Sequence, residues 1–178
     1  MNSLVEEARK RGIGVDRINE RNLEAIDRYG WALVMVAPSP GDTFAPFAYT
    51  VGLSREGGSE LIMLGIDHRT AGRILNDIAA IAWNRKTDLD GPLEDILDGG
   101  FSLDLRPMNP SEFSRYLGRL LWFHENFGSD PLRMTQVVWP DKLGRYPDDG
   151  RLTQEERERA ARRQPLLTEH RDGPANST

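Results

Sequence analysis

The segment of the chain richest in groups that can bind a ligand runs from Gln136 to Pro147 (QVVWPDKLGRYP). It gathers an amide, an indole, a carboxylate, a guanidinium and a phenol. An indole or a phenol can stack on a planar molecule, and a guanidinium can donate two parallel hydrogen bonds to a carboxylate or a phosphate. We therefore expect a site for a planar small molecule here, formed by Gln136, Trp139, Asp141, Arg145 and Tyr146.

The same segment also has a purely structural interpretation. Asp141 can cap a β-turn, and Arg145, which follows it in the sequence, can pair with its carboxylate. Strand periodicity adds a constraint, because Gln136 and Trp139 point to opposite sides of an extended strand. Both side chains can face one pocket only if the chain bends. The sequence leaves the binding interpretation and the structural interpretation open.

Two weaker signals lie outside this segment. Tyr49 and Thr50 belong to a strand-like stretch, and we expect them as neighbours of the ligand-binding cluster. His68 follows Asp67 where a strand is expected to give way to a helix, and polar groups at such points often line clefts. The alternative at this point is that Asp67 only caps the helix. Tyr49, Thr50 and His68 therefore complete the expected ligand-binding set.

The sequence contains no motif that identifies a reaction. A Gly-x-Ser-x-Gly nucleophile turn and a phosphate-binding loop are both absent from it. The histidines, His68, His124 and His170, are far apart, so their spacing predicts no metal site. Local spacing also forces no pair of titratable residues together. We assign no catalytic residue and no metal ligand, and the sequence leaves open whether the chain is an enzyme.

Composition limits the classes of partner. The chain of 178 residues has a net charge of -5, with Lys and Arg interspersed among Asp and Glu. A non-specific nucleic-acid binder needs a basic stripe, so we expect no nucleic-acid partner. No apolar run approaches the ~20 residues of a membrane span, and the N-terminal MNSLVEEARKRG lacks the apolar core of a signal peptide. The absence of cysteine fits a reducing compartment, and we expect a cytoplasmic protein without a membrane partner.

The helices and strands that position these residues can be predicted from the spacing of apolar residues and from the residues that begin and end each element. Residues 1–29 are expected to form two helices separated by Gly12–Gly14, the second beginning at Asp16 or Asn19 and ending at Gly30. Helical spacing of apolar residues predicts a helix over His68–Arg85. Apolar runs and alternation predict three strands, over 31–37, 47–53 and 61–66. The first is expected to be buried on both faces, and the third to pair antiparallel with the second. In the second strand the large residues lie on one side and small residues on the other; the large residues are Phe47, Tyr49, Val51 and Leu53.

The C-terminal half is expected to contain two strands and two helices. An acidic loop with one short turn is expected over Thr87–Gly100. Asn109, Pro110 and Glu112 have the spacing of a helix start, and Gly128 ends that helix. The other predicted elements are a half-solvated strand over 101–108, a buried strand over 134–139 and a charged helix over 153–163.

Strands that cluster early and late around two packed helices favour an α+β fold. We expect a mainly antiparallel sheet, with further helices at the N- and C-terminal ends of the chain. A mixed sheet is the alternative, because the helix over His68–Arg85 could cross over to a parallel strand. The length fits a single domain over residues 1–168, followed by a disordered tail over residues 169–178.

Several short motifs occur in a fixed order along the chain. They are 48–53 (AYTVGL), 60–61 (EL) leading to Gly65, 74–76 (ILN), 136–141 (QVVWPD), 144–147 (GRYP) and 164–167 (QPLL). Taken together, they resemble the bacterial domain of unknown function numbered 4262, from Phe47 to Leu167. The chain departs from that family at Gly58-Ser59, where His-Pro is frequent, and at Asp148, where tryptophan is frequent. The resemblance implies a domain type and brings no settled activity with it.

Three functions are compatible with these observations. The leading hypothesis is a cytoplasmic accessory or tailoring protein that binds a planar small molecule. The second is a flavin- or nicotinamide-dependent split-barrel oxidoreductase, because the order of strands over 31–66 loosely resembles flavin-binding barrels. That hypothesis makes flavin the cofactor to consider, and it requires the sheet to close into a barrel. The third is a protein-interaction module that uses the charged helix over 153–163, with a homodimer as one such assembly.

Overall fold

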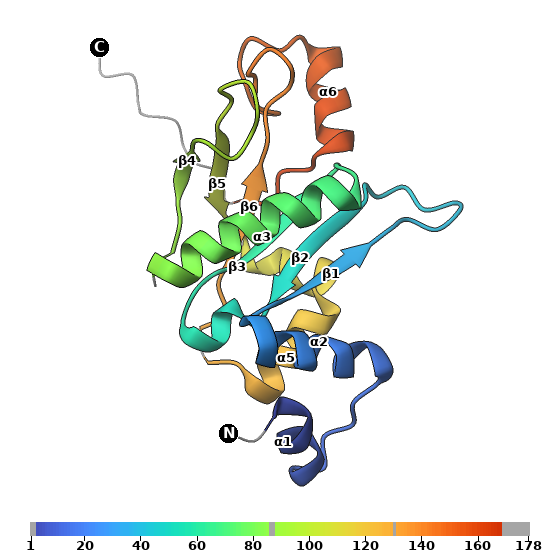
Figure 1. Cartoon of the computed structure of the whole chain (residues 1–178). Coiled ribbons are helices and arrows are strands. Elements are labelled where there is room, and N and C mark those ends of the chain that lie inside the picture. The colour runs from blue at the N-terminus through green and yellow to red at the C-terminus, as the bar shows by residue number, and fades with distance from the viewer. Residues whose placement is uncertain (1–2, 86–87, 130, 169–178) are drawn as a thin grey trace.

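The fold is built on a mixed sheet whose strands are ordered β1-β2-β3-β6-β5-β4 (Figure 1). The computed structural model describes residues 3–85, 88–129 and 131–168. Neighbouring strands run antiparallel except for β3 and β6, which are parallel. The predicted α+β class with a mostly antiparallel sheet is confirmed. The strands are β1 (Ala32–Val36), β2 (Phe47–Val51), β3 (Glu60–Leu64), β4 (Gly91–Leu93), β5 (Leu103–Pro107) and β6 (Met134–Val138).

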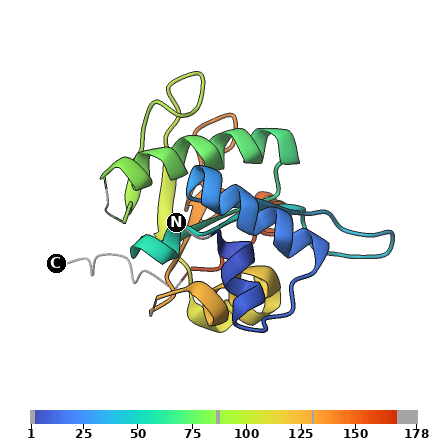
Figure 2. The ribbon, with the colours of Figure 1, turned by 60° about the horizontal axis from the view of Figure 1, so that its bottom comes forward.

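Helices cover both faces of this sheet. On one face α3 (His68–Arg85) packs against β2 and β3. The opposite face is covered by the N-terminal helices and by the helices between β5 and β6, as Figure 2 shows. A last helix follows β6 and lies beyond its end (Figure 1). The remaining helices are α1 (Leu4–Lys10), α2 (Arg17–Tyr29), α4 (Phe113–Tyr116), α5 (Gly118–Phe127) and α6 (Gln154–Arg163).

The alternation of large and small residues in β2 explains how the packing differs between the two faces of the sheet. Phe47, Tyr49 and Val51 belong to the core cluster shared with α2 and α5. Ala48 lies on the other face, in the cluster that contains the apolar residues of α3. A small residue there lets α3 approach the sheet closely. The predicted pattern fails at Leu53, because Gly52 turns the chain at a φ of 122° and Leu53 joins the α3 side.

Capping residues set both ends of α2 as predicted, and they also set the start of α6, where no cap was predicted. The carboxylate of Asp16 accepts from the N–H groups of Ile18 and Asn19 at the start of α2. Gly30 ends the same helix in the left-handed conformation, with a φ of 91°. At α6 the hydroxyl of Thr153 accepts from the N–H of Glu156, whose side chain accepts from the N–H of Thr153 in return.

Three predicted elements differ from the structure. The strand expected to be buried on both faces is β1, an edge strand in which Met35 is 39% exposed. The loop expected over 87–100 contains the short strand β4, which pairs with β5. The helix expected after Asn109 is divided into a 3₁₀ turn (Pro110–Glu112), α4 and α5, because Leu117 leaves the helical conformation at a φ of -116°.

The sheet does not close on itself. Its two outer strands are β1 and β4, and the strands of the described residues show no pairing between these two. The split barrel that the oxidoreductase hypothesis requires is therefore not formed by the described part of the chain. In the same residues, no helix combines the length and the apolar character that crossing a bilayer requires. The tail expected over 169–178 lies outside the described residues.

Candidate functional site

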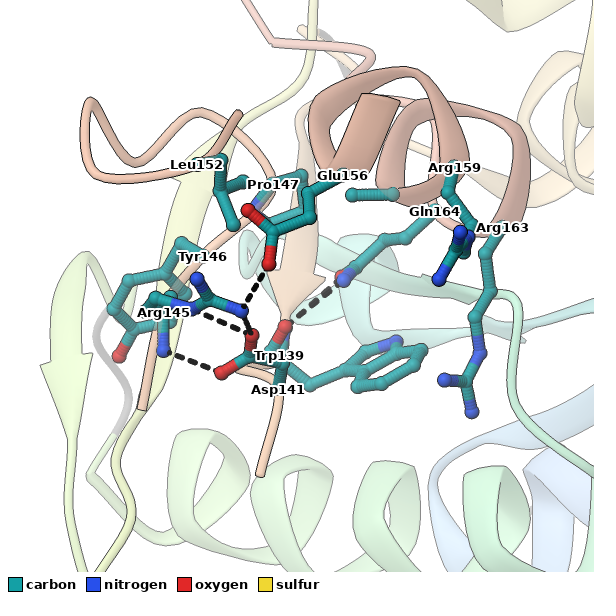
Figure 3. A pocket seen from close by; sticks show the side chains of 11 residues that line it. Trp139, Asp141, Arg145, Tyr146, Pro147, Leu152, Glu156, Arg159, Arg163 and Gln164 are labelled. Carbon is teal, nitrogen blue, oxygen red and sulfur yellow. Dashed lines mark hydrogen bonds and ion pairs between the residues drawn. The ribbon is translucent and has the colours of Figure 1, made fainter. Parts of the chain in front are cut away.

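A cavity lies beside the predicted cluster, where β6 ends. β3 and β6 are the parallel pair of the described sheet, so their C-terminal ends open at the same edge. A cavity of about 190 Å³ lies at this edge, between the loop that follows β6 and the helix α6 (Figure 3). Its lining comprises Trp139, Asp141, Arg145, Tyr146, Pro147, Leu152, Glu156, Arg159, Ala160, Arg163 and Gln164.

A compact turn after β6 forms one wall of this cavity. One oxygen of Asp141 accepts from the N–H groups of Leu143 and Arg145 at 2.8 and 2.9 Å. Its other oxygen accepts from Nε of Arg145 at 2.8 Å. The structural interpretation of this segment, a turn capped by Asp141 and paired with Arg145, is therefore present in the molecule. It coexists with a cavity beside the turn.

Arg145 also connects the turn to α6. Its guanidinium donates to Oε1 of Glu156 at 3.1 Å (Figure 3). Desolvation opposes ionisation of Asp141, but hydrogen bonds from Arg145 and Leu143 outweigh it and lower the pKa of this carboxyl. The pKa of Glu156 is lowered by the backbone N–H of Thr153 and by Arg145. Both carboxylates are thus held ionised around one guanidinium.

The indole of Trp139 is fixed from several directions. Its Nε1 donates to the carbonyl oxygen of Leu64, at the end of β3, at 2.9 Å. The side-chain amide of Gln164 accepts from the N–H of Trp139 and donates to its carbonyl oxygen, both at 2.9 Å. The guanidinium carbon of Arg163 lies 4.5 Å from the centre of the indole ring. Trp139 and Arg163 together form an oriented cation–π pair beside the cavity.

The comparisons with known proteins identify the family of this chain. Residues 25–153 match the family described as Domain of unknown function (DUF4262). The chain belongs to this family. Neither the curated proteins nor the solved structures contain a match to it. The DUF4262 match starts earlier than the resemblance seen in the sequence, which begins at Phe47, and ends before the motif over 164–167.

Some residues that line the cavity lie within the DUF4262 match, and others lie after it. Trp139, Asp141, Arg145 and Tyr146 lie within the matched residues, whereas the arginines of α6 lie after them. These four residues were predicted from the sequence to form a cluster, and the structure brings them around one cavity. The hydroxyl of Tyr146 donates to the carbonyl oxygen of Ser102 at 2.9 Å, so this hydroxyl is already engaged within the protein.

The other predicted site residues lie elsewhere in this DUF4262 chain. Gln136, Tyr49, Thr50 and His68 are not among the described residues that line the cavity. Gln136 is buried and donates to the carbonyl oxygen of Pro165, while its own carbonyl accepts from the N–H of Leu167, both at 2.7 Å. Because its two polar groups hold the C-terminal segment, Gln136 has a structural role here.

Thr50 and Tyr49 were expected as neighbours of the cluster, and the structure places them apart from it. Thr50 is fully buried, donates to Oε2 of Glu60 at 2.6 Å and accepts from the N–H of Leu61. Tyr49 points to the opposite face of β2 and lines a groove of about 620 Å³ near α5. Successive residues of a strand face opposite sides, so adjacent positions cannot share one pocket.

His68 begins α3 and lies against the edge of the sheet. Its Nε2 lies 3.2 Å from the carbonyl oxygen of Val36, at the end of β1. The side chain of Asp67 accepts from the N–H of Thr70 at 3.0 Å, as the capping interpretation predicts. Among the described residues, no group of three His, Asp or Glu side chains is arranged to hold a metal ion.

The structure also reveals cavity residues that the sequence prediction missed. Glu156, Arg159 and Arg163 follow one another at helical spacing, so they lie on the same face of α6. That spacing was visible in the sequence, but the direction in which the face points was not. Pro147 and Leu152 supply the buried apolar part of the lining.

Proposed function

We propose that this DUF4262 chain binds a planar small molecule in the cavity between the end of β6 and α6. The observation that carries the proposal is the fixed indole of Trp139 in the cavity lining. An aromatic side chain whose rotamer is already locked can stack on a ligand ring at little entropic cost. The cavity lies at the edge where the C-terminal ends of the parallel strands β3 and β6 open, so residues from both strand ends can contribute to it.

The size of the cavity favours a single-ring ligand. Pockets for drug-sized molecules have volumes of about 300–1,000 Å³. The cavity here has a volume of about 190 Å³, below that range. A one-ring compound therefore fits better than a flavin or a nicotinamide dinucleotide. This comparison supports the binding proposal over the oxidoreductase alternative, whose barrel the described sheet does not form.

The electrostatics favour binding over catalysis. The two carboxylates in the lining, Asp141 and Glu156, have pKa values held below their ordinary values. A general base works best when its pKa lies near the operating pH. Lowered pKa values therefore make both groups weak bases, and their oxygens already accept hydrogen bonds from Arg145. We place the protein as an accessory component that holds or delivers its ligand.

The proposal can be tested with single-ring probes. We would titrate benzoate and benzamide into the protein by calorimetry, with cyclohexanecarboxamide as a non-planar comparison. At least one planar probe is expected to bind more tightly than the non-planar one. Trp139→Leu is expected to abolish this binding, and Trp139→Phe to retain part of it, because an aromatic face remains.

A matched control is available on α3. Trp83 is 37% exposed and does not line the cavity, so Trp83→Leu is expected to leave binding unchanged. Circular dichroism and thermal unfolding of each variant would show that the fold is retained. The proposal fails if no planar probe binds the wild-type protein, or if Trp139→Leu binds the probes as the wild type does.

A further inference from the structure

The arginines that line the cavity differ in how they are partnered. Arg145 is engaged by the carboxylates of both Asp141 and Glu156. Arg159 pairs with Glu155 at 2.8 Å, but both side chains are more than two-thirds exposed, at 72% and 81%. Such exposed pairs contribute little and are easily exchanged for another anion. The guanidinium of Arg145 is therefore held by carboxylates of the protein itself, whereas the side chain of Arg159 can turn toward a ligand.

Arg163 has no carboxylate partner among the described residues. Its contact is with the face of the Trp139 indole, over which its guanidinium lies. Stacking uses the flat face of a guanidinium and leaves the N–H groups along its edge free to donate. Figure 3 shows Arg163 and Arg159 on one side of Trp139, with Asp141 and Arg145 on the other side. The Arg163 side of the cavity is therefore the side that favours an anion.

The backbone of Arg163 is held in place by its surroundings. Its carbonyl oxygen packs against Gly65, where the absence of a side chain leaves room for it. The next residue, Gln164, is fixed to the backbone of Trp139 by two hydrogen bonds. The start of this side chain is thus positioned before any ligand arrives, which lowers the entropy that binding would cost.

We propose that the ligand is a single-ring aromatic carboxylate, whose ring lies against Trp139 and whose carboxylate accepts paired hydrogen bonds from Arg163. The inference rests on the proposed function. It adds the charge of the ligand and names the residue that recognises this charge. A carboxylate matches the fork of N–H groups at the guanidinium edge. The guanidinium and the ligand then lie side by side over the indole, with Arg159 as a second positive charge.

The test compares benzoate with benzamide, which has the same shape without the charge. In the wild-type protein, benzoate is expected to bind at least about tenfold more tightly than benzamide. Arg163→Gln is expected to remove this preference, because it weakens benzoate binding far more than benzamide binding. Arg163→Lys is expected to keep only part of it, because an ammonium retains the charge but lacks the fork.

Arg162 provides the matched control. It is the neighbouring arginine on α6, is exposed and does not line the cavity, so Arg162→Gln should keep the full preference for benzoate. Inorganic phosphate is a further probe, and it should bind more weakly than benzoate, because it cannot stack on Trp139.

The outcomes separate the two proposals. Equal binding of benzoate and benzamide, both lost in Trp139→Leu, would overturn the anion inference while the binding function stands. Retention of the benzoate preference in Arg163→Gln would overturn the role of Arg163. Phosphate binding as tight as benzoate would show that charge alone is recognised. If neither ring compound binds, the proposed function fails as well.

Discussion

Gly65 lies against the carbonyl oxygen of Arg163, and a Cβ atom at position 65 would overlap that oxygen. Gly65 follows β3, and Arg163 is the last residue of α6, so this contact joins the sheet to the helix that covers the cavity. The side chain of Trp139 bridges the same two places, because it bonds to Leu64 and stacks with Arg163. The end of β3 therefore sets where α6 can lie.

Gly65→Ala is expected to destabilise the protein and to displace the end of α6. Gly65 has a φ of +76°, which strains any residue with a side chain, and the overlap with Arg163 adds to this strain. We expect a loss of at least about 2 kcal/mol in the free energy of unfolding, measured with urea. Gly91 has a similar φ of +81° with open space around it, so Gly91→Ala measures the backbone strain alone. Equal losses in the two variants would contradict the role of the contact with Arg163.

A buried carboxylate holds the start of β3 to the end of β2. Glu60 is fully buried and accepts from the hydroxyls of Thr50 and Ser54 and from the N–H groups of Gly52 and Ser54. Glu60→Gln would place amide hydrogens opposite some of these donors, so buried polar groups would lose partners. We expect a loss of about 2–3 kcal/mol in the free energy of unfolding. The exposed Glu56 is a control of the same type, and Glu56→Gln should have little effect.

This network shows what sequence patterns can and cannot reveal. The alternation in β2 and the helical spacing in α3 predicted both elements, because burial imposes a period on the chain. The partner of Thr50 could not be predicted, because the antiparallel pairing was expected without its register, and the register of β2 with β3 brings Glu60 to Thr50. Without knowledge of this partner, Thr50 was interpreted as a ligand contact.

Local patterns also predicted only part of the sheet and only part of the cavity. A continuous apolar run predicted β1 as a strand but could not show that it lies at the edge of the sheet. β4 was missed because three residues carry too short a pattern, and it pairs only with β5 among the described strands. The wall of the cavity after β6 is contiguous in sequence and was predicted. The wall from α6 depends on how that helix packs, which local spacing does not determine.

Gln136→Leu is expected to release the C-terminal segment from the sheet. The amide of Gln136 bonds to both Pro165 and Leu167, and the N–H of Asn109 donates to the carbonyl oxygen of Leu167. Leucine fills similar space but leaves the buried N–H of Leu167 and the partly buried carbonyl of Pro165 without these partners, at a cost of about 1–3 kcal/mol for the buried group and less for the other. Hydrogen exchange of the Leu167 N–H should become much faster in the variant. Unchanged protection at Leu167 would show that other contacts hold the segment.

Stability at high pH is expected to depend on Tyr49. Burial raises the pKa of the Tyr49 phenol to about 12, although the backbone N–H and the charge of Arg119 oppose part of the shift. An unfolded phenol titrates near its ordinary value of 10.0. As the pH rises from about 10 to about 12, the unfolded chain therefore loses this proton before the folded chain does, and the free energy of unfolding falls. Below pH 10 the phenol is protonated in both states and contributes no pH dependence.

Tyr49→Phe removes the titrating group while it keeps the buried ring. Its free energy of unfolding should fall less steeply between pH 10 and pH 12 than that of the wild-type protein, with a difference of up to about 3 kcal/mol at the upper end. Tyr29 is 61% exposed, so Tyr29→Phe, which removes a phenol outside the core, is the matched control. Parallel curves for Tyr49→Phe and the wild type would mean that the Tyr49 phenol ionises as easily in the folded protein as in the unfolded chain. In that case the groove that Tyr49 lines beside α5 would be open enough to hydrate the phenolate.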